Sequence, residues 1–561
     1  MRTAIAMTAR RLRPGVGLGV FAGYLAISII FWGQEVVQDP ARKCLCLGDD
    51  PSLFMWSLSW WPHAIGAGTN PFVTHAIYVP DGYNLTWATA VPAASLAVWP
   101  VTALAGPVAA WNVLMLGAPA LAAFAAFTLC RELTGRFGPS LVGGYLFGFS
   151  SFMLAESLAH LHLTLSFPLP WALLLAVRRY RGGLSRRRFV AWLAVVSVVQ
   201  VLCSTEAALM LAVMSCAGAV AWLAFADREA RRRLGALLAE AVGASAIAAV
   251  VLAPYLWYAF KDVRPDSIRS PYLFSGDALN LLIPTAVTRL GHQTFAPVAD
   301  RFLANAAESG LYLGVPIVVL LSLYALRAPA GAAKRSLLAF AGIALLFALG
   351  PSLQIAGQST LKLPWREAVK LPLLNNVLPV RFALYLWLAV AVIVALWLAL
   401  PTTGIASWGI AALGLAFLVP SVNSPIWHSK LDDPPFFRDG GYRHVLRHDE
   451  TIVALPLGAY GASMLWAAET HIDIRLAGGY IAPELPDGYA RDPFIQDVDA
   501  ANGNPPANLA STLPAFLRRT GATRIVVSEA RGATWSAALQ SLGYKGRAVG
   551  GVVVYPVAAT T

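Results

Sequence analysis

The sequence predicts a polytopic α-helical membrane protein with a small α/β domain at its C-terminal end. Of the 561 residues, 57% are hydrophobic and only 13% are charged, whereas a soluble domain carries about 25% charged residues. Many separate apolar stretches reach membrane-spanning length, which is typical of a multi-pass protein. After Pro420 the chain turns polar and contains no further stretch of that kind.

The apolar stretches predict about eleven spans. The first, residues 15–37, is too long for a cleavable signal peptide, and no small-residue cleavage site follows it before the polar loop. The expected spans cover residues 15–37, 108–130, 138–155, 163–177, 189–205, 207–225, 235–258, 309–326, 336–350, 381–400 and 404–421.

Basic residues in the loops between spans indicate the orientation of the chain. Short loops rich in Lys and Arg stay in the cytoplasm, and few acidic residues lie among them. This distribution accounts for the net charge of +12 without a nucleic-acid partner. The basic residues assigned to the inner side are Arg2, Arg10, Arg11, Arg13, Arg131, Arg136, Arg178, Arg179, Arg181, Arg186, Arg187, Arg188, Arg228, Arg231, Arg232, Arg233, Arg327, Lys334 and Arg335.

One apolar stretch, residues 89–106, is expected not to span. Counting it as a span would move the arginine-rich loop 178–188 to the outer side, against the charge rule. Pro92, Pro100 and Pro107 also suit a shallow interfacial or re-entrant helix better than a straight crossing. The outer side then receives loop 38–107, the turn 156–162, loop 259–308, loop 351–380 and residues 422–561.

The polar C-terminal part has the pattern of a small α/β domain. Residues 451–455, 524–528 and 552–555 predict short strands. A helix is expected from Asn508 to Thr520, closed by Gly521. The expected domains are therefore a membrane domain, residues 1–421, with outer loops 38–107, 259–308 and 351–380, and an outer α/β domain, residues 422–561.

An acidic pair, Asp49 and Asp50, lies just beyond the first span. Carboxylates at a membrane surface beside the aromatic-rich segment 52–66 suggest acid–base chemistry on a lipid-carried substrate. Because Pro51 follows directly, the pair also fits the cap of a helix over 52–66. Both interpretations stay open at this point.

The five cysteines give little information about function. Cys44 and Cys46 lie in the first outer loop, where a disulfide can persist, but a C-x-C ring is tight and the pairing stays open. A metal site on this pair would need two more ligands. The nearest histidines, His63 and His75, have no recognised metal-binding spacing, so we expect no bound metal.

Polar residues stand out at the outer ends of two spans. Glu156, His160 and His162 precede the span 163–177, and Glu206 lies between two spans. Ionisable residues in such apolar surroundings are costly and often functional, although a solvated turn is the structural alternative. The two histidines are two residues apart and would not share a helix face, so that pair alone does not predict a metal site.

The order of these features resembles the GT-C superfamily of polyprenyl-phosphate-dependent membrane glycosyltransferases. The shared features are an N-terminal span, a long outer loop opening with the acidic motif Gly48-Asp-Asp-Pro51, interfacial helices and then short-looped spans. In that superfamily a second sizeable outer loop follows the seventh span, where loop 259–308 falls here. The resemblance covers residues 10–420, and the topology is more specific than the motif.

The resemblance implies transfer of a sugar from a polyprenyl-phosphate donor to an outer glycan, lipid or protein acceptor. Such a reaction needs a base for the acceptor hydroxyl, and Asp50 or Asp49 would serve, with a slight preference for Asp50. Glu156, His160, His162 and Glu206 are expected to bind substrate. No cofactor is expected, and no divalent metal, because a monophosphate leaving group carries less charge than a pyrophosphate.

The developing charge on the lipid phosphate needs cationic donors. Arg366, Lys370 and Arg381 lie in and just after loop 351–380 and are the first candidates. A second set follows the seventh span. It consists of Lys261, Arg264 and Arg269. For each of these residues, contact with lipid headgroups at the end of a span is the alternative interpretation.

Functions other than sugar transfer remain as alternatives. A flippase or transporter needs a polar path at mid-bilayer, whereas the ionisable residues here lie at the ends of spans. A membrane polysaccharide polymerase or ligase would also use a lipid-linked sugar, and a non-enzymatic scaffold would need no site.

We expect the protein to lie in the inner (plasma) membrane, with the N-terminus in the cytoplasm and the C-terminal domain outside.

Overall fold

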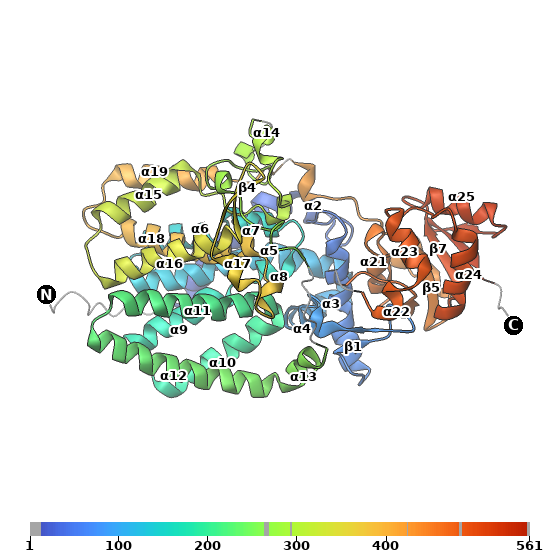
Figure 1. Cartoon of the computed structure of the whole chain (residues 1–561), viewed down its shortest axis with the longest axis horizontal. Coiled ribbons are helices and arrows are strands. Elements are labelled where there is room, and N and C mark those ends of the chain that lie inside the picture. Colours follow the sequence, from blue (N-terminus) through green and yellow to red (C-terminus); the bar gives the residue numbers. More distant parts are fainter. Residues whose placement is uncertain (1–12, 263–268, 292–293, 423, 482–484, 558–561) are drawn as a thin grey trace. The chain divides into compact units, whose positions relative to one another are not determined.

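A computed structural model describes residues 13–262, 269–291, 294–422, 424–481 and 485–557 (Figure 1). The chain divides into two compact units, each built from three separate segments. Unit 1 contains Met1–Gln34, Met115–Ala253 and Arg264–Trp427. Unit 2 contains Glu35–Leu114, Pro254–Val263 and His428–Thr561. Each unit is described by itself below.

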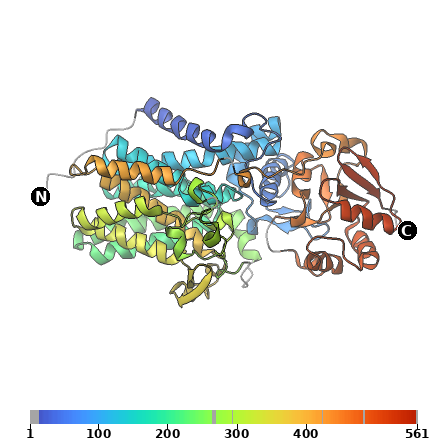
Figure 2. The same ribbon diagram turned by 90° about the horizontal axis from the view of Figure 1, so that it is seen from above.

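Unit 1 is helical, and its helices occupy all eleven positions at which the sequence predicts a span (Figures 1 and 2). Its longer helices are α1 (Pro14–Ser28), α5 (Trp99–Thr134, which begins in unit 2), α6 (Phe137–Gly148), α9 (Pro168–Tyr180), α10 (Arg186–Cys203), α11 (Thr205–Phe225), α12 (Arg228–Val251), α15 (Gly314–Arg327), α16 (Ala332–Ala348), α18 (Ala383–Leu398) and α19 (Ile405–Phe417).

Shorter elements connect these helices. They are η1 (Ile29–Gly33), α2 (Gln34–Val36), α7 (Ser151–Glu156), α8 (Leu161–Thr164), η3 (Ala278–Leu281), η4 (Arg289–Gly291), α14 (Ala296–Ala299), η5 (Ala306–Glu308), α17 (Trp365–Ala368), η6 (Leu374–Asn376), η7 (Pro379–Phe382) and η8 (Pro425–Trp427), with a hairpin of β3 (Ser352–Ile355) and β4 (Gln358–Lys362).

Within the described residues, seven helical segments are long and apolar enough to cross a bilayer, fewer than the expected eleven. They are Pro14–Val36, Trp99–Thr134, Phe137–Glu156, Leu161–Tyr180, Thr205–Phe225, Arg228–Val251 and Pro379–Leu398. The other four predicted spans are helices α10, α15, α16 and α19. Three of them have 13–17 residues, and α10 opens with three arginines.

The expected span 235–258 is broken into two helices. Helix α12 ends at Val251 and α13 (Ala253–Lys261) follows after Leu252. Pro254 explains the break, because proline has no N–H to continue the helical hydrogen-bond pattern. The segment 89–106 is also interrupted: Val91 and Gly106 have positive φ angles on either side of α4 (Pro92–Ala97) and the start of α5.

The core of unit 1 lies around helix α18. The segment Pro379–Leu398 is 94% buried, and α18 packs against α6, α15 and α16. A helix that is apolar on every side is stable only inside a protein or a membrane. By contrast, α11 and α12 are mostly exposed: only 17% of an 18-residue apolar stretch in each helix is buried. Their surfaces are therefore suited to contact with lipid.

Unit 2 contains an α/β domain and the segment that follows the first predicted span. In the described part of the chain, five strands form a sheet in the order β6-β5-β7-β9-β8. Strand β5 is parallel to both of its neighbours and fully buried, whereas β9 is antiparallel to β7 and β8. The strands are β5 (Glu450–Leu455), β6 (Ile474–Leu476), β7 (Arg524–Ser528), β8 (Arg547–Val549) and β9 (Val552–Pro556).

The remaining elements of unit 2 are helical turns, helices and a small hairpin. They are α3 (Asp50–Gly66), β1 (Val73–Thr74), β2 (Tyr83–Asn84), η2 (Leu85–Trp87), α4, α13, α20 (Pro435–Arg438), η9 (Gly441–His444), η10 (Gly458–Tyr460), α21 (Ser463–Glu469), α22 (Asp487–Ala490), α23 (Pro493–Ala500), α24 (Leu509–Thr520) and α25 (Ala533–Ser541). The three predicted strands and the predicted helix before Gly521 are therefore confirmed.

The loop before α3 is held by a disulfide and by hydrogen bonds. Cys44 and Cys46, whose pairing the sequence left open, are bonded to each other and buried. Between them, the Leu45 N–H donates to Asn112 Oδ1 at 3.1 Å, and the Leu45 carbonyl accepts from Trp111 Nε1 at 2.9 Å. These contacts fix the chain directly upstream of the acidic pair.

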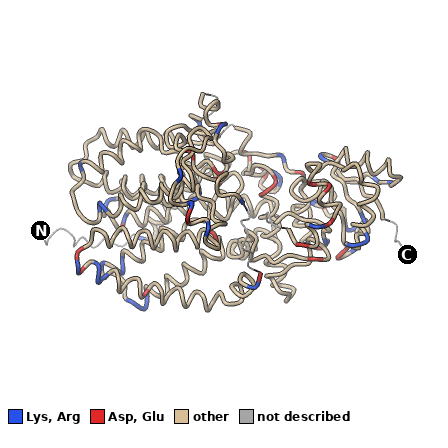
Figure 3. Tube along the Cα trace, in the orientation of Figure 1, with Lys and Arg blue, Asp and Glu red and all other residues tan. Residues whose placement is uncertain are grey.

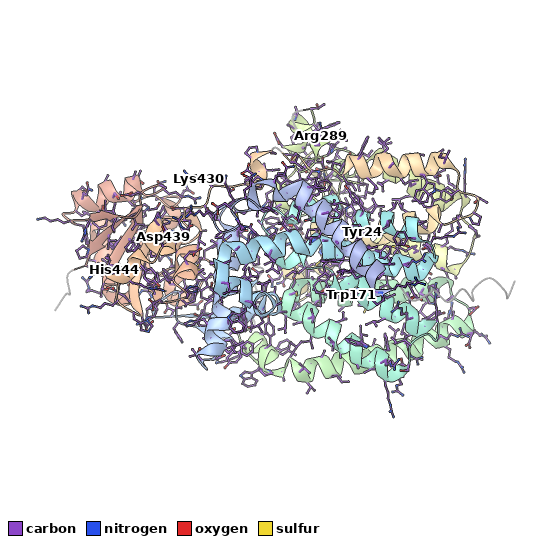
Figure 4. The ribbon with its side chains drawn as sticks, turned by 180° about the vertical axis from the view of Figure 1, so that it is seen from behind. Tyr24, Trp171, Arg289, Lys430, Asp439 and His444 are labelled. Atoms are coloured by element: carbon purple, nitrogen blue, oxygen red, sulfur yellow. A yellow bond between two sulfur atoms is a disulfide. The ribbon has the colours of Figure 1, made fainter. Side chains whose placement is uncertain are left out.

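Close packing of α5 and α6 depends on glycines. A Cβ on Gly148 would lie 2.4 Å from the Pro119 carbonyl oxygen and 2.7 Å from the Ala123 nitrogen, both backbone atoms. Nearby, the Tyr24 hydroxyl (Figure 4) donates to the Leu141 carbonyl at 2.8 Å. Small residues that let helix backbones approach closely are common between membrane helices.

We therefore predict that Gly148→Ala destabilises the protein by about 1–3 kcal/mol, the usual cost of inserting a methyl group into a closely packed contact. The midpoint of thermal unfolding in detergent measures the effect. Gly117→Ala on α5 is the matched control, because its Cβ meets no atom within 4 Å and Ala favours a helix over Gly. Equal midpoints for the two variants would contradict the packing argument.

Candidate functional site

A buried ionic cluster in unit 1 brings together side chains from four distant segments. We call it the Arg381 cluster: Glu156 from the end of α7, His160 from the following turn, Glu206 from α11, Glu308 from η5 and Arg381 from η7. The side chains of Glu156 and Glu308 are 1% and 2% exposed, and the other three are 11–18% exposed. A set of charges buried to this degree is costly unless every charge is paired.

Arg381 is the centre of the cluster. Its Nε donates to Glu308 Oε1 and Oε2, each at 3.2 Å, and its Nη2 also contacts Glu308. Its Nη1 contacts Glu206, whose other oxygen accepts from the Leu378 N–H at 3.2 Å. Two carboxylates on different sides therefore fix the plane of the guanidinium, the geometry for which arginine is suited.

The histidines join the cluster on the other side of Glu308. His160 Nδ1 lies 2.6 Å from Glu156 Oε2 and 3.7 Å from Glu308 Oε1. The rings of His160 and His162 have centroids 5.9 Å apart, and His162 is buried. The structure thus brings Glu156, His160, His162, Glu206 and Arg381 together, as five of the expected substrate-binding residues.

Local capping interactions place the acidic residues. Ser204 caps α11 by accepting from the Ala207 N–H, which leaves Glu206 in the first turn, where a carboxylate is favoured by the helix dipole. The side chain of Asn305 accepts from the Glu308 N–H at 3.0 Å and forms the turn η5. These are ordinary capping residues, and they direct the two carboxylates that hold Arg381.

The charges of the cluster do not cancel. Three carboxylates face one guanidinium, so the cluster is short of positive charge, and protonation of His160 reduces that shortfall. One oxygen or nitrogen atom from each of Glu156, His160 and Glu308 lies within 4.8 Å of the others, an arrangement that could hold a metal ion. A protonated histidine and a divalent cation are therefore the two means of supplying further positive charge here.

The other predicted cationic residues take no part in the recorded contacts of this cluster. Lys370 is exposed and pairs with Glu367. Among residues that the structure describes, neither it nor Arg366 makes a hydrogen bond or ion pair with the cluster. Of the second set, Lys261 ends α13 in unit 2 and Arg269 belongs to unit 1. Arg264 lies outside the described residues.

In unit 2, the acidic pair begins helix α3. Asp49 occupies the N-cap position, but its side chain caps no backbone N–H. Its Oδ1 instead accepts from Arg531 Nη1 at 2.7 Å, and Ser52 bonds to its backbone carbonyl. Asp50 Oδ1 accepts from the Tyr480 hydroxyl at 2.5 Å. The two carboxylates thus have different environments: an ion pair for Asp49 and a hydroxyl donor for Asp50.

A second acidic motif lies close to the first. The sequence Leu431-Asp-Asp-Pro434 repeats the acid–acid–proline order of residues 49–51. Asp432 is buried, and its burial raises its pKa, while Ser528 and Arg531 act to lower it and Asp49 to raise it. The Arg531 guanidinium also donates to the Lys430 carbonyl. Arg531 therefore organises acidic residues that are almost 400 positions apart in the chain.

Three participants were missed from the sequence. Glu308 had a usable signal, since it is a lone acidic residue directly before an apolar helix. Asp432 could have been found from the repeated acid–acid–proline pattern. Arg531 is one of many arginines in a polar domain, and the local sequence contains no signal that links it to Asp49.

Comparison with solved structures shows the GT-C fold. Arabinofuranosyltransferase AftD from Mycobacteria superposes with a TM-score of 0.60 at 17% identity, over 98% of this chain and 40% of that one. This chain therefore spans about two fifths of the length of AftD. ArnT from Cupriavidus metallidurans, bound to undecaprenyl phosphate, superposes with a TM-score of 0.52 at 13% identity, over 96% of this chain and 98% of ArnT.

A third likeness is to the archaeal oligosaccharyltransferase AglB from Archaeoglobus fulgidus, solved with an inhibitory peptide and a dolichol-phosphate. Its TM-score is 0.50 at 15% identity, over 97% of this chain and 74% of AglB. The expected GT-C fold is thus confirmed, together with the class of multi-pass α-helical membrane protein.

The sequence comparisons are less informative about chemistry. No curated protein matches the sequence. One family model matches residues 20–420, which include the whole of the Arg381 cluster and the acidic pair. The chain therefore belongs to the family described as a domain of unknown function, DUF6311.

Proposed function

We propose that this protein is a membrane glycosyltransferase that moves a sugar from a polyprenyl-phosphate donor to a glycan, lipid or protein acceptor. The observation that carries the proposal is the Arg381 cluster, a fixed guanidinium at the ends of spans in a GT-C fold. ArnT and AglB, which share the fold, were solved with undecaprenyl phosphate and with a dolichol-phosphate.

Arg381 is the proposed contact for the donor phosphate. A guanidinium has five N–H donors, and the contacts to Glu206 and Glu308 use three of its nitrogens. The two remaining N–H groups point in directions that the carboxylates have fixed. Donors oriented before the reaction stabilise charge that develops on a leaving phosphate without any cost of rearrangement.

The negative charge of the cluster sets a condition on phosphate binding. An anionic phosphate approaching three carboxylates and one arginine needs further positive charge nearby. We propose that protonated His160 supplies it, so that no resident metal is required. A divalent cation on Glu156, His160 and Glu308 is the alternative source, and chelation separates the two.

Asp50 is the proposed base for the acceptor hydroxyl. The Asp49 carboxylate is already held by the Arg531 guanidinium, at 2.7 Å. Asp50 Oδ1 accepts from the Tyr480 hydroxyl, a neutral donor, at 2.5 Å. A proton on Asp49 would weaken its charge-assisted bond to Arg531, so we propose the neighbouring carboxylate as the base.

Transport of a lipid-linked sugar is the main alternative function. It would need ionisable groups near the middle of the spans. In unit 1 the cluster residues lie instead at span termini: Glu156 ends Phe137–Glu156, Glu206 is the second residue of Thr205–Phe225, and Arg381 is the third of Pro379–Leu398. This placement favours chemistry at the membrane surface.

The first prediction concerns the acidic pair. Asp50→Asn keeps the shape of the side chain but removes the base, so turnover with undecaprenyl-phosphate-linked hexoses or pentoses should fall by about 10²–10⁴-fold. Asp49→Asn is the matched control and should reduce turnover far less. Both variants should elute as folded protein in size-exclusion chromatography. Full activity in both would show that the acidic pair is structural.

The second prediction concerns Arg381. Arg381→Lys keeps the charge but loses the planar fork, so turnover should fall by about 10²–10³-fold, the usual effect of removing a donor to a developing charge. Lys370→Gln removes an exposed positive charge from the same outer loop and should leave turnover unchanged. An equal loss in both variants would exclude a specific role for Arg381.

Chelation tests the source of the second positive charge. We expect turnover of the unmodified protein to persist after dialysis against EDTA, because His160 and Arg381 together supply the charge. Loss of turnover that Mn²⁺ restores would assign that role to a metal on Glu156, His160 and Glu308 instead. Neither result changes the turnover expected for Arg381→Lys.

Another prediction concerns orientation, which we propose to be cytoplasmic for the N-terminus and loop 178–188 and outer for residues 422–561. Exposed Ser185 and Ser541 are replaced by cysteine, one at a time, after Cys130, Cys203 and Cys216 are changed to serine. A membrane-impermeant maleimide added to intact cells should label Ser541→Cys and spare Ser185→Cys. The reverse pattern would overturn the assigned orientation.

A further inference from the structure

A basic pocket lies at the end of unit 1 where helix α9 stops and α12 begins. Its volume is about 280 Å³. The residues that line it are Arg179, Tyr180, Arg181, Gly182, Arg233, Ala236 and Leu237. Neither the proposed base nor the Arg381 cluster contributes to it.

The three arginines of the pocket differ in how fully they are paired. Arg179 makes a bidentate ion pair with Glu240, at 2.7 and 2.6 Å, which holds α9 against α12. Arg181 donates through Nη1 to the Glu132 carbonyl at 2.8 Å. Arg233 donates through Nε to Glu229 at 2.9 Å, and in the described part of the chain its two Nη atoms make no hydrogen bond. Arg233 and Arg181 therefore retain donors that an anion can use.

The surroundings of the pocket carry a large surplus of positive charge. Figure 3 shows Lys and Arg positions, blue on the Cα trace, gathered at this end of the helices. The acidic residues nearby are Glu132, Asp227, Glu229 and Glu240. The basic residues are Arg178, Arg179, Arg181, Arg186, Arg187, Arg188, Arg228, Arg231, Arg232 and Arg233. This surplus outweighs the partial negative charge of the C-terminal end of α9, which also faces the pocket.

An exposed apolar surface continues from the pocket along α12. Only 17% of an 18-residue apolar stretch of this helix is buried. Further along the same face of the helix as Arg233 and Ala236, the large side chains Ile247 and Val251 are 49% and 61% exposed. A basic recess followed by exposed apolar side chains on one helix face matches an amphiphile, which has an anionic head followed by hydrocarbon.

We propose that this pocket binds the headgroup of an anionic phospholipid, whose acyl chains lie along α12. The phosphate accepts hydrogen bonds from Arg181 and Arg233, while Arg179 stays paired with Glu240 and keeps the walls of the pocket together. The volume suits one headgroup, because pockets for larger, drug-sized ligands span about 300–1,000 Å³.

This site is separate from the proposed transfer site. His160 and His162 lie at the start of the segment Leu161–Tyr180, and the pocket lies at its other end. Helix α9 alone has 13 residues, which at 1.5 Å per residue is about 20 Å, and the break after α8 adds to this separation. The headgroup therefore occupies the opposite surface of the membrane and touches no residue assigned to chemistry.

Native mass spectrometry of the detergent-solubilised full chain tests the proposal. The probes are dioleoylphosphatidylglycerol, dioleoylphosphatidylcholine and soluble glycerol 3-phosphate. We expect one phosphatidylglycerol to bind at least tenfold more tightly than phosphatidylcholine. The double variant Arg181→Gln/Arg233→Gln should weaken that binding by about tenfold or more, since each arginine near a lipid contributes roughly a factor of five.

Arg232→Gln is the matched control, because it removes one charge next to Arg233 from a side chain that does not line the pocket. It should change phosphatidylglycerol binding less than threefold. Equal losses in the control and in the single variant Arg233→Gln would overturn the pocket in favour of diffuse attraction to the basic surface. If millimolar glycerol 3-phosphate displaces phosphatidylglycerol, the proposal of a lipid ligand is wrong and the pocket binds a soluble phosphate compound.

Discussion

The pairing of Arg381 with Glu206 and Glu308 is the constraint on which unit 1 depends. These residues come from the start of α11, the turn before α15 and the turn before α18. Because removing one partner from a buried pair leaves an uncompensated charge, at a cost of about 3–5 kcal/mol, the three helix ends must stay together. The buried helix α18 begins directly after Arg381, so the same contact that orients the guanidinium also fixes the position of the core helix.

Composition and spacing were enough to predict the fold class. The apolar stretches correctly predicted a helix at every expected span, and the β-branched runs correctly predicted strands β5, β7 and β9. Strands β6 and β8 were missed because each has three residues, too few for a pattern of alternation. The break between α12 and α13 was also missed, although Pro254 marks it, because the apolar stretch continues on both sides.

The candidate site was predictable only where the apolar surroundings made a polar residue conspicuous. Glu156, His160, His162, Glu206 and Arg381 were found in this way, because an ionisable residue at the end of a span is unusual. Arg366 and Lys370 were chosen by proximity in the sequence to Arg381, and among the described residues neither makes a hydrogen bond or ion pair with the cluster. Proximity in the sequence did not reveal which cations share a buried contact, whereas polarity within an apolar stretch identified the residues that do.

The ion pair between Asp49 and Arg531 joins residues 482 positions apart. A ribosome that adds about 5–20 residues per second needs roughly 25–100 s to make that length of chain. Throughout this time Asp49 is already synthesised, yet its partner does not exist. The loop that precedes α3 can be closed early by the disulfide between Cys44 and Cys46, but unit 2 is completed only when the last strands have emerged. The segment that contains Asp49 therefore cannot complete its native contacts until the segment that contains Arg531 has been synthesised.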